Sequence, residues 1–214
     1  MKKLTIVTAF LICVMISLTH ASDLKPIQLK KPDMTRKGTL MEALSKRQTT
    51  REYSNKMITD QELSDLLWAA NGINRPAESK RTAPSAMNAQ DIDIYVLTAQ
   101  GVYLYDAKKN TLEPVTAGDH RAQISSQQAF VATAPVNLML VSDLSRFTRA
   151  DDANKPGLAA MDAGIVSQNI SLFCASVGLA TVVRAFIDHD KMTPILKLKP
   201  EQKILLNHPV GYPK

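Results

Sequence analysis

Apolar residues recur at helical spacing in two short segments near the start of the chain, and each segment follows a capping signal. Thr39 and Thr59 are each followed three residues later by a glutamate. In this arrangement, a capping box, the hydroxyl and the carboxylate accept hydrogen bonds from backbone amides that the helix start leaves free. The pattern predicts one helix that ends near Arg47 and a second that ends at Gly72.

The rest of the chain shows a changing hydrophobic period. Residues 73–83 are polar and have no period, which predicts a surface loop. Apolar runs and alternations predict strands over residues 92–96, 102–104, 112–115, 136–141, 181–186 and 203–206. Helical spacing predicts helices over residues 120–133, 158–177 and 188–198. Because helices and strands do not alternate one for one, this order favours an α+β sandwich, with helices flanking a mixed central sheet, over regular β-α-β winding.

The segment 158–177 is apolar around much of its helical circumference and is followed by Gly178, a residue type that commonly terminates helices. A helix of this kind is expected to be buried on several sides. Cys174 lies within it. Its apolar surroundings favour a buried, unreactive thiol over a nucleophile.

The first 21 residues have the pattern of a signal peptide. Lys2 and Lys3 precede an apolar run over residues 4–18, and Ala21 supplies a small residue for cleavage. The run is shorter than the about 20 residues that span a bilayer, although an uncleaved membrane anchor is the alternative. We expect an exported protein, periplasmic or extracellular, with no stable membrane span after cleavage.

Between this segment and the first helix, residues 22–37 are polar and contain two prolines. The composition predicts a linker or an N-terminal arm on the surface. The folded domain is expected to begin near Gly38 and to occupy residues 38–214. This length suits one domain with a substantial core.

The charge balance argues against one class of partner. The 214-residue chain has a formal net charge of +6. Loss of Lys2 and Lys3 would leave 24 basic residues against 20 acidic ones, a charge of about +4. The basic residues are dispersed and have no aromatic residues between them, which argues against a nucleic-acid-binding face. The four histidines lack the spacing of metal ligands, so no metal site is predicted.

The segment Arg47–Arg51 places two arginines on either side of a Gln-Thr-Thr run. An arginine fork matches the oxygens of a phosphate group, and a threonine hydroxyl can donate beside it. The segment is therefore a candidate for binding a phosphate and a sugar chain. Its alternative is a solvated helix face, on which two arginines at helical spacing are common.

A second segment, Pro84–Gln90, consists mainly of small and amide residues. The side chains of Asn88 and Gln90 can both donate and accept hydrogen bonds, as the edge of a heteroaromatic ring requires. The alternative is an ordinary turn capped by Asn88.

A third segment, Gly178–Phe186, leads from a helix end into an apolar strand that contains one charged residue, Arg184. One interpretation is a core strand with a surface arginine. The other is a backbone edge that lies along a flat cofactor, to which Arg184 and Ala185 present their amide groups.

In this order the segments resemble those of the nitroreductase family of flavoproteins, including its branch of thiazoline- and oxazoline-oxidising relatives. The family has an R-x-S/T-x-R/K element after the first helix, a P-S-x-x-N-x-Q element before the first strand, a D-x-G-x-x-x-Q-N-x-x-L helix, a G-L-x-x-V element and a terminal G-Y-P strand. Here these are residues 47–51, 84–90, 162–172, 178–182 and 209–213. The resemblance covers residues 38–214.

The resemblance implies a nitroreductase-like fold and an obligate homodimer with two FMN molecules at the subunit interface. The flavin N5 atom then carries the chemistry, and no side chain need act as an acid or base. Three groups of residues would contact the cofactor: Arg47, Thr49 and Arg51 at the phosphate and ribityl chain or the polar edge of the ring; Ser85, Ala86, Met87, Asn88 and Gln90 at the ring or ribityl chain, partly across the dimer; and the backbone of Val183, Arg184 and Ala185 near N5.

Two positions depart from the family's pattern. Many members have a Glu-Gly pair where Arg184 and Ala185 stand, so nicotinamide access and the contact to N5 are expected to differ here. The basic phosphate ligand that follows the terminal G-Y-P strand is represented by Lys214 alone. Asp162 and residues 168–172 are expected to hold the core helix and the interface.

The implied activity is that of an FMN-dependent oxidoreductase. Its flavin takes electrons from a small-molecule donor and passes them to an electron-poor acceptor such as a nitroaromatic compound or a quinone. Because NAD(P)H is a cytoplasmic metabolite, export makes it a questionable donor. The alternatives are a flavin-dependent dehydrogenase of a peptide or heterocycle, and an exported flavin-binding protein without turnover.

Overall fold

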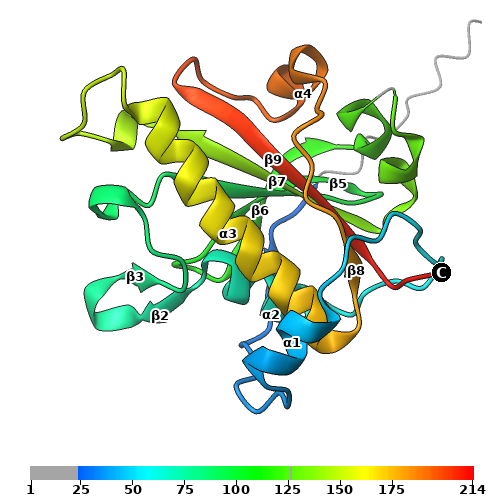
Figure 1. Ribbon diagram of the computed structural model, residues 1–214. Helices are drawn as coiled ribbons and strands as arrows, with labels where there is room; N and C mark the ends of the chain where they lie inside the picture. The colour runs from blue at the N-terminus through cyan, green and yellow to red at the C-terminus, as the bar shows by residue number, and fades with distance from the viewer. Residues whose placement is uncertain (1–23, 126) are drawn as a thin grey trace, which may run out of the picture.

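A computed structural model gives the fold of residues 24–125 and 127–214. The predicted signal peptide lies outside these residues. Seven strands form one sheet in the order β1-β6-β5-β4-β7-β9-β8 (Figure 1). The strands are β1 (Ile27–Gln28), β4 (Ile92–Leu97), β5 (Gly101–Asp106), β6 (Thr111–Ala117), β7 (Val136–Asp143), β8 (Ala180–Thr181) and β9 (Gln202–Gly211).

The direction of the strands corrects one part of the prediction. The α+β class is confirmed, but all pairings among the described strands of this sheet are antiparallel and the sheet is not mixed. Short turns after β4 and β5 can join only antiparallel neighbours. The long connection from β7 to β9 leaves and returns at the same end of the sheet, because Asp143 pairs with Gln202. Strand β9 therefore runs antiparallel to β7.

Both early helices form with the predicted caps. Helices α1 (Leu40–Lys46) and α2 (Asp60–Asn71) each begin with a complete capping box, in which Thr39 and Thr59 accept hydrogen bonds from the amide three residues later. Helix α3 (Lys155–Val177) ends at Gly178, whose φ of 75° is left-handed and suits glycine. Helix α4 (His189–Ile195) is shorter than the predicted 188–198.

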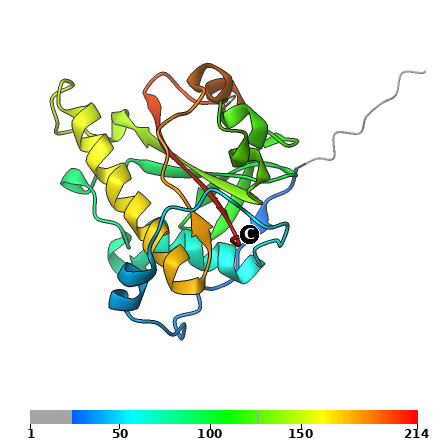
Figure 2. The same cartoon turned by 45° about the vertical axis from the view of Figure 1, so that its right-hand side comes forward.

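The sheet has helices on both faces, as a sandwich requires (Figures 1 and 2). Leu138 and Leu140 of β7 pack with α2 and α3, whereas Met139 and Val141 pack with α4 and the segment before β7. This division follows from the alternation of side chains along a strand. Each such fully buried side chain contributes about 1.5–3 kcal/mol relative to exposure.

Residues 24–37 run as an arm that is fixed to the domain. Strand β1 pairs with β6, and the side chain of Leu29 is buried in the core. The amide of Asp33 donates to the carboxylate of Asp65 on α2 at 2.8 Å. The packed body therefore begins before Gly38, where the sequence pattern placed its start.

The predicted helix over residues 120–133 is wrong. The segment forms two short 3-10 helices, η3 (Arg121–Ile124) and η4 (Ala129–Thr133). Ser125 between them is extended, and neither helix has a side-chain cap. The break allows Ile124 and Val131 both to be buried against the sheet.

Other boundaries differ in ways that the apolar pattern does not encode. Residues 73–83, predicted as a loop, include a hairpin of β2 (Ile73–Arg75) and β3 (Lys80–Arg81) with a 3-10 turn, η1 (Pro76–Glu78), at its tip. The predicted strand 181–186 contains only Thr181, the second residue of β8, and one isolated bridge at Arg184. Two further 3-10 helices are η2 (Ala86–Asn88) and η5 (Leu144–Arg146).

Candidate functional site

The predicted site residues fall into two groups at the two ends of α3. The turn 85–90 contacts Asp162, in the first half of the helix. Residues 47–51 lie beside Gly178, where the helix ends. Asp162 and Gly178 are 16 positions apart in the sequence, which is about 24 Å along a helix with a rise of 1.5 Å per residue. One chain therefore does not bring its two groups together.

Backbone pairing fixes the group at the end of α3. The amide of Thr50 donates to the carbonyl of Thr181 on β8 at 3.0 Å, and the amide of Ser54 donates to the carbonyl of Tyr212 at 2.9 Å. The Tyr53 hydroxyl donates to the carbonyls of Thr50 and Pro209, at 3.0 and 3.3 Å. Residues 50–54 are thereby held between β8 and the C-terminal segment.

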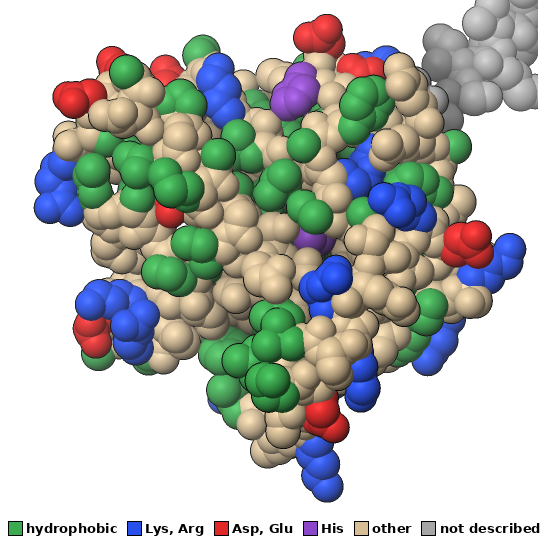
Figure 3. Space-filling model, in the orientation of Figure 1, with side chains coloured by type: hydrophobic (Ala, Val, Ile, Leu, Met, Phe, Trp, Pro, Cys, Tyr) green, Lys and Arg blue, Asp and Glu red, His purple; other side chains and the backbone are tan. Residues whose placement is uncertain are grey.

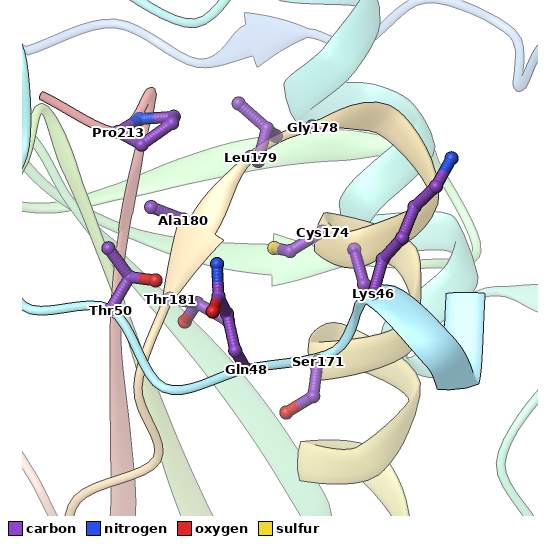
Figure 4. A pocket seen from close by; sticks show the side chains of 11 residues that line it. Lys46, Gln48, Thr50, Ser171, Cys174, Gly178, Leu179, Ala180, Thr181 and Pro213 are labelled. Atoms are coloured by element: carbon purple, nitrogen blue, oxygen red, sulfur yellow. The ribbon is translucent and has the colours of Figure 1, made fainter. Parts of the chain in front are cut away.

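Figure 4 shows a small cavity under this segment. Gln48 and Thr50 point toward it, opposite Cys174 of α3 and Thr181 of β8, and its volume is about 200 Å³. The volume is below the about 300 Å³ at which small-molecule pockets begin. Since side chains alternate along an extended segment, Arg47, Thr49 and Arg51 are expected on the other side.

Those three side chains are exposed, and none of them makes a side-chain hydrogen bond or an ion pair with a described residue. Arg51 lines a groove of about 670 Å³ together with Lys214 and the aromatic residues Tyr53 and Phe130. The structure thus brings together two of the predicted phosphate ligands, Arg51 and Lys214, in one groove.

The segment that follows β8, residues 182–185, exposes one backbone edge. Arg184 and Asn207 exchange both backbone hydrogen bonds, at 2.9 and 2.7 Å. The amide of Arg184 is therefore occupied, which corrects the expectation that it faces a cofactor. Val183 and Ala185 turn their amides the other way, where no described residue accepts from them.

The Arg184 side chain is buried, so it is not the surface arginine of the alternative interpretation. Its guanidinium donates to Gln128 Oε1 at 2.6 Å, to Asn207 Oδ1 at 2.6 Å and to the Phe186 carbonyl at 2.7 Å. It also lies 5.7 Å from the centre of the Phe130 ring. Burial lowers the pKa of Arg184, although an arginine stays protonated in a protein.

The turn at the other end of α3 has an unusual backbone. Met87, Asn88 and Gln90 have φ angles of 55°, 55° and 49°, in the left-handed region that favours glycine. Ala86 donates its amide to both carboxylate oxygens of Asp162, at 3.0 and 2.9 Å, and Gln90 donates its amide to Ser85 Oγ at 2.8 Å. Strained backbone held by such contacts is typical of functional turns.

Side chains of this turn divide into bound and open ones. The side-chain amide of Gln90 accepts from Arg81 Nε at 3.0 Å and donates to the carbonyl of Ser79 at 3.0 Å. These contacts tie the turn to the β2–β3 hairpin. Met87 and Asn88 are exposed. Ser85 and Ala86 are half-buried. Of the predicted ring contacts in this segment, Met87 and Asn88 are therefore the most accessible.

Two buried carboxyl groups support this turn, and sequence reasoning missed one of them. Asp91 is fully buried; its Oδ2 accepts from Ser142 Oγ at 2.5 Å, and its Oδ1 has no hydrogen-bond partner among the described residues. Burial, and then the neighbouring Asp162, raise the pKa of Asp91 well above its usual range. The only signal in the sequence was an aspartate directly before a buried strand, which does not reveal a partner 71 positions away.

His208 connects α3 to the strands beneath the Arg47–Arg51 segment. Its ring lies 2.8 Å from Ser167 Oγ and 3.1 Å from Thr181 Oγ1. Thr181 donates its hydroxyl to the Pro209 carbonyl, so it accepts from Nδ1 of the ring. Burial lowers the pKa of His208 to about 3, and the residue is a neutral structural link.

Comparisons with known proteins agree with this arrangement. The family model described as the nitroreductase family matches residues 44–212. A protein of Methanocaldococcus jannaschii, named provisionally as a nitroreductase, is 32% identical over 195 residues, which are 86% of this chain and 96% of that protein.

Solved structures show the same relationship. A protein of Ralstonia eutropha, also named provisionally as a nitroreductase, superposes with a TM-score of 0.84 at 32% identity, over 90% of this chain and 91% of that one. The NADPH:FMN oxidoreductase of Vibrio harveyi, solved with NAD+, shares the fold with a TM-score of 0.62 at 22% identity, over 82% of this chain and 69% of that one. On the family match and the two relatives at 32% identity, the chain belongs to the nitroreductase family of flavin-dependent oxidoreductases.

Proposed function

We propose that the chain binds FMN in the groove beside Arg51 and Lys214 and uses it as an oxidoreductase. One observation carries the proposal: two basic side chains line a groove of about 670 Å³. Phe130 also lines this groove, and its ring lies against the Arg184 guanidinium. Small-molecule sites have volumes of about 300–1000 Å³, so the groove has room for a flavin nucleotide. The smaller cavity of Figure 4 does not.

Arg51 and Lys214 line the groove together with one acidic residue, Glu52, so its described lining has a net positive charge that suits a phosphate group. Arg47 and Thr49 adjoin Arg51 in the chain without lining the groove. Arg47, Thr49 and Arg51 are exposed and have donors that no described side chain uses. A guanidinium can give a phosphate two parallel charge-assisted hydrogen bonds, and a threonine hydroxyl adds a third. Lys214 adds a further positive charge. In this assignment these residues bind the phosphate and the start of the ribityl chain.

The free backbone edge of residues 183–185 suits the isoalloxazine ring of FMN. The amides of Val183 and Ala185 point away from β9 and are free to donate to ring acceptors near N5. Bound FMN would supply a ring that accepts and releases two electrons. The chain's own contribution is to orient that ring along the edge and to limit the access of water to one of its faces.

We further propose that a second copy of this chain completes the site. By length and composition alone α3 could cross a membrane, with a mean hydropathy of 1.3, yet only 39% of that window is buried. Its exposed stripe contains Gly157, Met161, Gly164 and Ile165, and both glycines have open space beside them. Small residues of this kind permit close approach of another backbone.

The surface around this stripe also fits a homodimer. Apolar side chains gather over α1 and along α3 on the face shown in Figure 3. They include Leu40, Met41 and Leu44 of α1. An apolar surface of this extent marks an interaction site. In a two-fold dimer, the turn with Met87 and Asn88 of one subunit would reach the groove of the other, which accounts for the separation of the two groups within one chain.

The finer features of the proposed reaction follow from location. We propose an exported protein, on the pattern of residues 1–21, and an electron-poor acceptor such as a quinone or a nitroaromatic compound. An exported protein would meet little NAD(P)H. We therefore propose a donor other than a nicotinamide.

Purified protein tests the cofactor and the donor in turn. We expect yellow protein with flavin absorbance, or colourless protein that becomes yellow with added FMN. Under anaerobic conditions, dithionite should bleach the bound flavin whereas NADH and NADPH should not. Protein that FMN cannot reconstitute would contradict flavin binding. Rapid bleaching by a nicotinamide would contradict only the proposed choice of donor.

A further inference from the structure

Arg184 is a buried cation for which the described part of the chain supplies no counter-ion. The residue is 5% exposed. All three of its hydrogen-bond acceptors are neutral: the side-chain amides of Gln128 and Asn207 and the carbonyl of Phe186. No described carboxylate lies within 4.0 Å of its guanidinium.

A charge in this position is unfavourable for the fold by itself. Burial of an ion is compensated when an opposite charge lies beside it, and here only dipoles do. Half-buried Arg81 also donates only to neutral acceptors, a side-chain amide and a backbone carbonyl. Several other guanidinium groups are paired with a carboxylate. Arg121, with a side chain 15% exposed, has the carboxylate of Asp119 at 2.6 Å. Arg184 is the only described arginine that is fully buried, and it has no such partner.

The position of the charge relates it to the proposed flavin groove. Arg184 belongs to the segment 182–185, whose free backbone edge is formed by Val183 and Ala185. Its guanidinium lies 5.7 Å from the Phe130 ring, and Phe130 lines the groove. Buried, apolar surroundings screen a charge far less than water does. Its field therefore extends into the groove.

We propose that the uncompensated charge of Arg184 raises the reduction potential of a flavin bound along the 183–185 edge. The inference rests on the proposed function. In the half-reaction, the neutral oxidised ring takes up two electrons and one proton and becomes a reduced ring with one net negative charge. A nearby positive charge stabilises the reduced form more than the oxidised form.

Four variants separate the charge from the packing. Arg184→Gln removes the charge, and Arg184→Lys keeps it with fewer hydrogen bonds. Gln128→Glu keeps Arg184 in place and sets a carboxylate where a neutral oxygen now accepts from its Nε at 2.6 Å. Arg121→Gln is the matched control, because it removes a guanidinium whose charge Asp119 already compensates.

The experiment is a dithionite titration of each FMN-loaded protein against a redox dye, followed by absorbance. We expect Arg184→Gln and Gln128→Glu to lower the preference for reduced over oxidised flavin about tenfold. For a two-electron couple this corresponds to a potential about 30 mV lower. Arg184→Lys and Arg121→Gln should stay close to the parent.

Each other outcome has a definite meaning. If Arg184→Gln does not fold, Gln128→Glu decides, because it retains the guanidinium. An unchanged potential in Gln128→Glu, or a loss in Arg184→Lys as large as in Arg184→Gln, would overturn the inference and leave flavin binding intact. A parent protein that binds no FMN would remove the proposed function, and this inference with it.

Discussion

The two ends of α3 carry polar segments of similar length that use their side chains in opposite ways. Beside Gly178, the side chains of Arg47, Thr49 and Arg51 are exposed and bind no described residue. Beside Asp162, most polar groups of the turn 85–90 form hydrogen bonds that hold the turn in its conformation. The first end leaves its polar side chains open, whereas the second uses them to hold a particular backbone conformation.

This difference gives the two segments different sensitivities. A substitution at the open end would remove a contact to the proposed FMN and should leave the fold unchanged. A substitution at the closed end leaves buried polar groups without partners, which costs stability. Ligand affinity and unfolding free energy therefore report separately on the two ends.

The largest effect is expected from the carboxyl proton of Asp91, next to the turn 85–90. The pKa of Asp91 is about 7 in the folded chain and 3.8 as its ordinary value, so the folded state binds this proton more tightly. The resulting stabilisation is full below pH 4 and is lost as the pH rises to 7. His208 acts in the opposite sense, because its pKa is lowered from 6.5 to about 3 in the folded chain. The stabilisation that it contributes is full above pH 6.5 and is lost as the pH falls toward 3.

Asp91→Asn should remove the pH dependence of stability that comes from Asp91 and leave the one that comes from His208. The side-chain oxygen of an asparagine can still accept from Ser142. We predict that its unfolding free energy, relative to the parent, rises by on the order of a few kcal/mol between pH 4 and pH 7. Urea unfolding at several pH values measures this. The exposed Asp151→Asn is the control, and a difference that is constant with pH would rule out the raised pKa of Asp91.

A smaller loss is expected when the support of the turn is removed. Asp162→Ala leaves the half-buried amide of Ala86 without its acceptor and the carboxyl of Asp91 without its neighbour. We predict a loss of about 2–3 kcal/mol in unfolding free energy. Chemical denaturation of the flavin-free protein is the measurement, with Asp190→Ala, at an exposed site on α4, as control. Parent-like stability would show that the turn holds itself.

The open end should respond in affinity and not in stability. Arg47→Ala removes a charge-assisted contact worth about 1.5–3 kcal/mol, so FMN affinity should fall at least tenfold. Gln48→Ala changes a side chain that points to the small cavity and should bind FMN like the parent. Fluorescence titration measures both. An Arg47→Ala protein with parent-like affinity would refute the phosphate assignment.

The smallest effect concerns backbone strain in the closed turn. Met87 has a φ of 55°, where a side chain is unfavourable and glycine is not. Met87→Gly should therefore stabilise the flavin-free protein by up to about 1 kcal/mol. Met57→Gly, at an exposed methionine without a positive φ, should destabilise it slightly. Thermal unfolding of the two variants should give shifts of opposite sign; shifts of the same sign would argue against strain.

Local signals predicted the parts of the fold that local chemistry determines. The capping boxes at Thr39 and Thr59 and the helix end at Gly178 were correct because each depends on neighbours within a few residues. The helix predicted over residues 120–133 failed because burial of Ile124 and Val131 against the sheet decides its shape. Strand direction likewise depends on where a connection returns, which no local pattern records.

The candidate site shows the same division. The Arg47–Arg51 and Pro84–Gln90 segments could be found by residue type, and the structure places Arg51 with Lys214 as expected. Whether a polar group is open or occupied could not be found, because the partners are distant in sequence: Asp162 binds Ala86, and Asn207 binds Arg184. Only the fold separates ligand-binding polar residues from structural ones.

Sedimentation velocity of the FMN-loaded protein, followed at a flavin absorption band, tests the central claim most directly. The claim is that the two ends of α3 meet across two copies of the chain to form the flavin site. The account predicts that flavin sediments with the dimer at one FMN per subunit. Flavin that sediments with a stable monomer, or remains free while the protein forms a dimer, would contradict it.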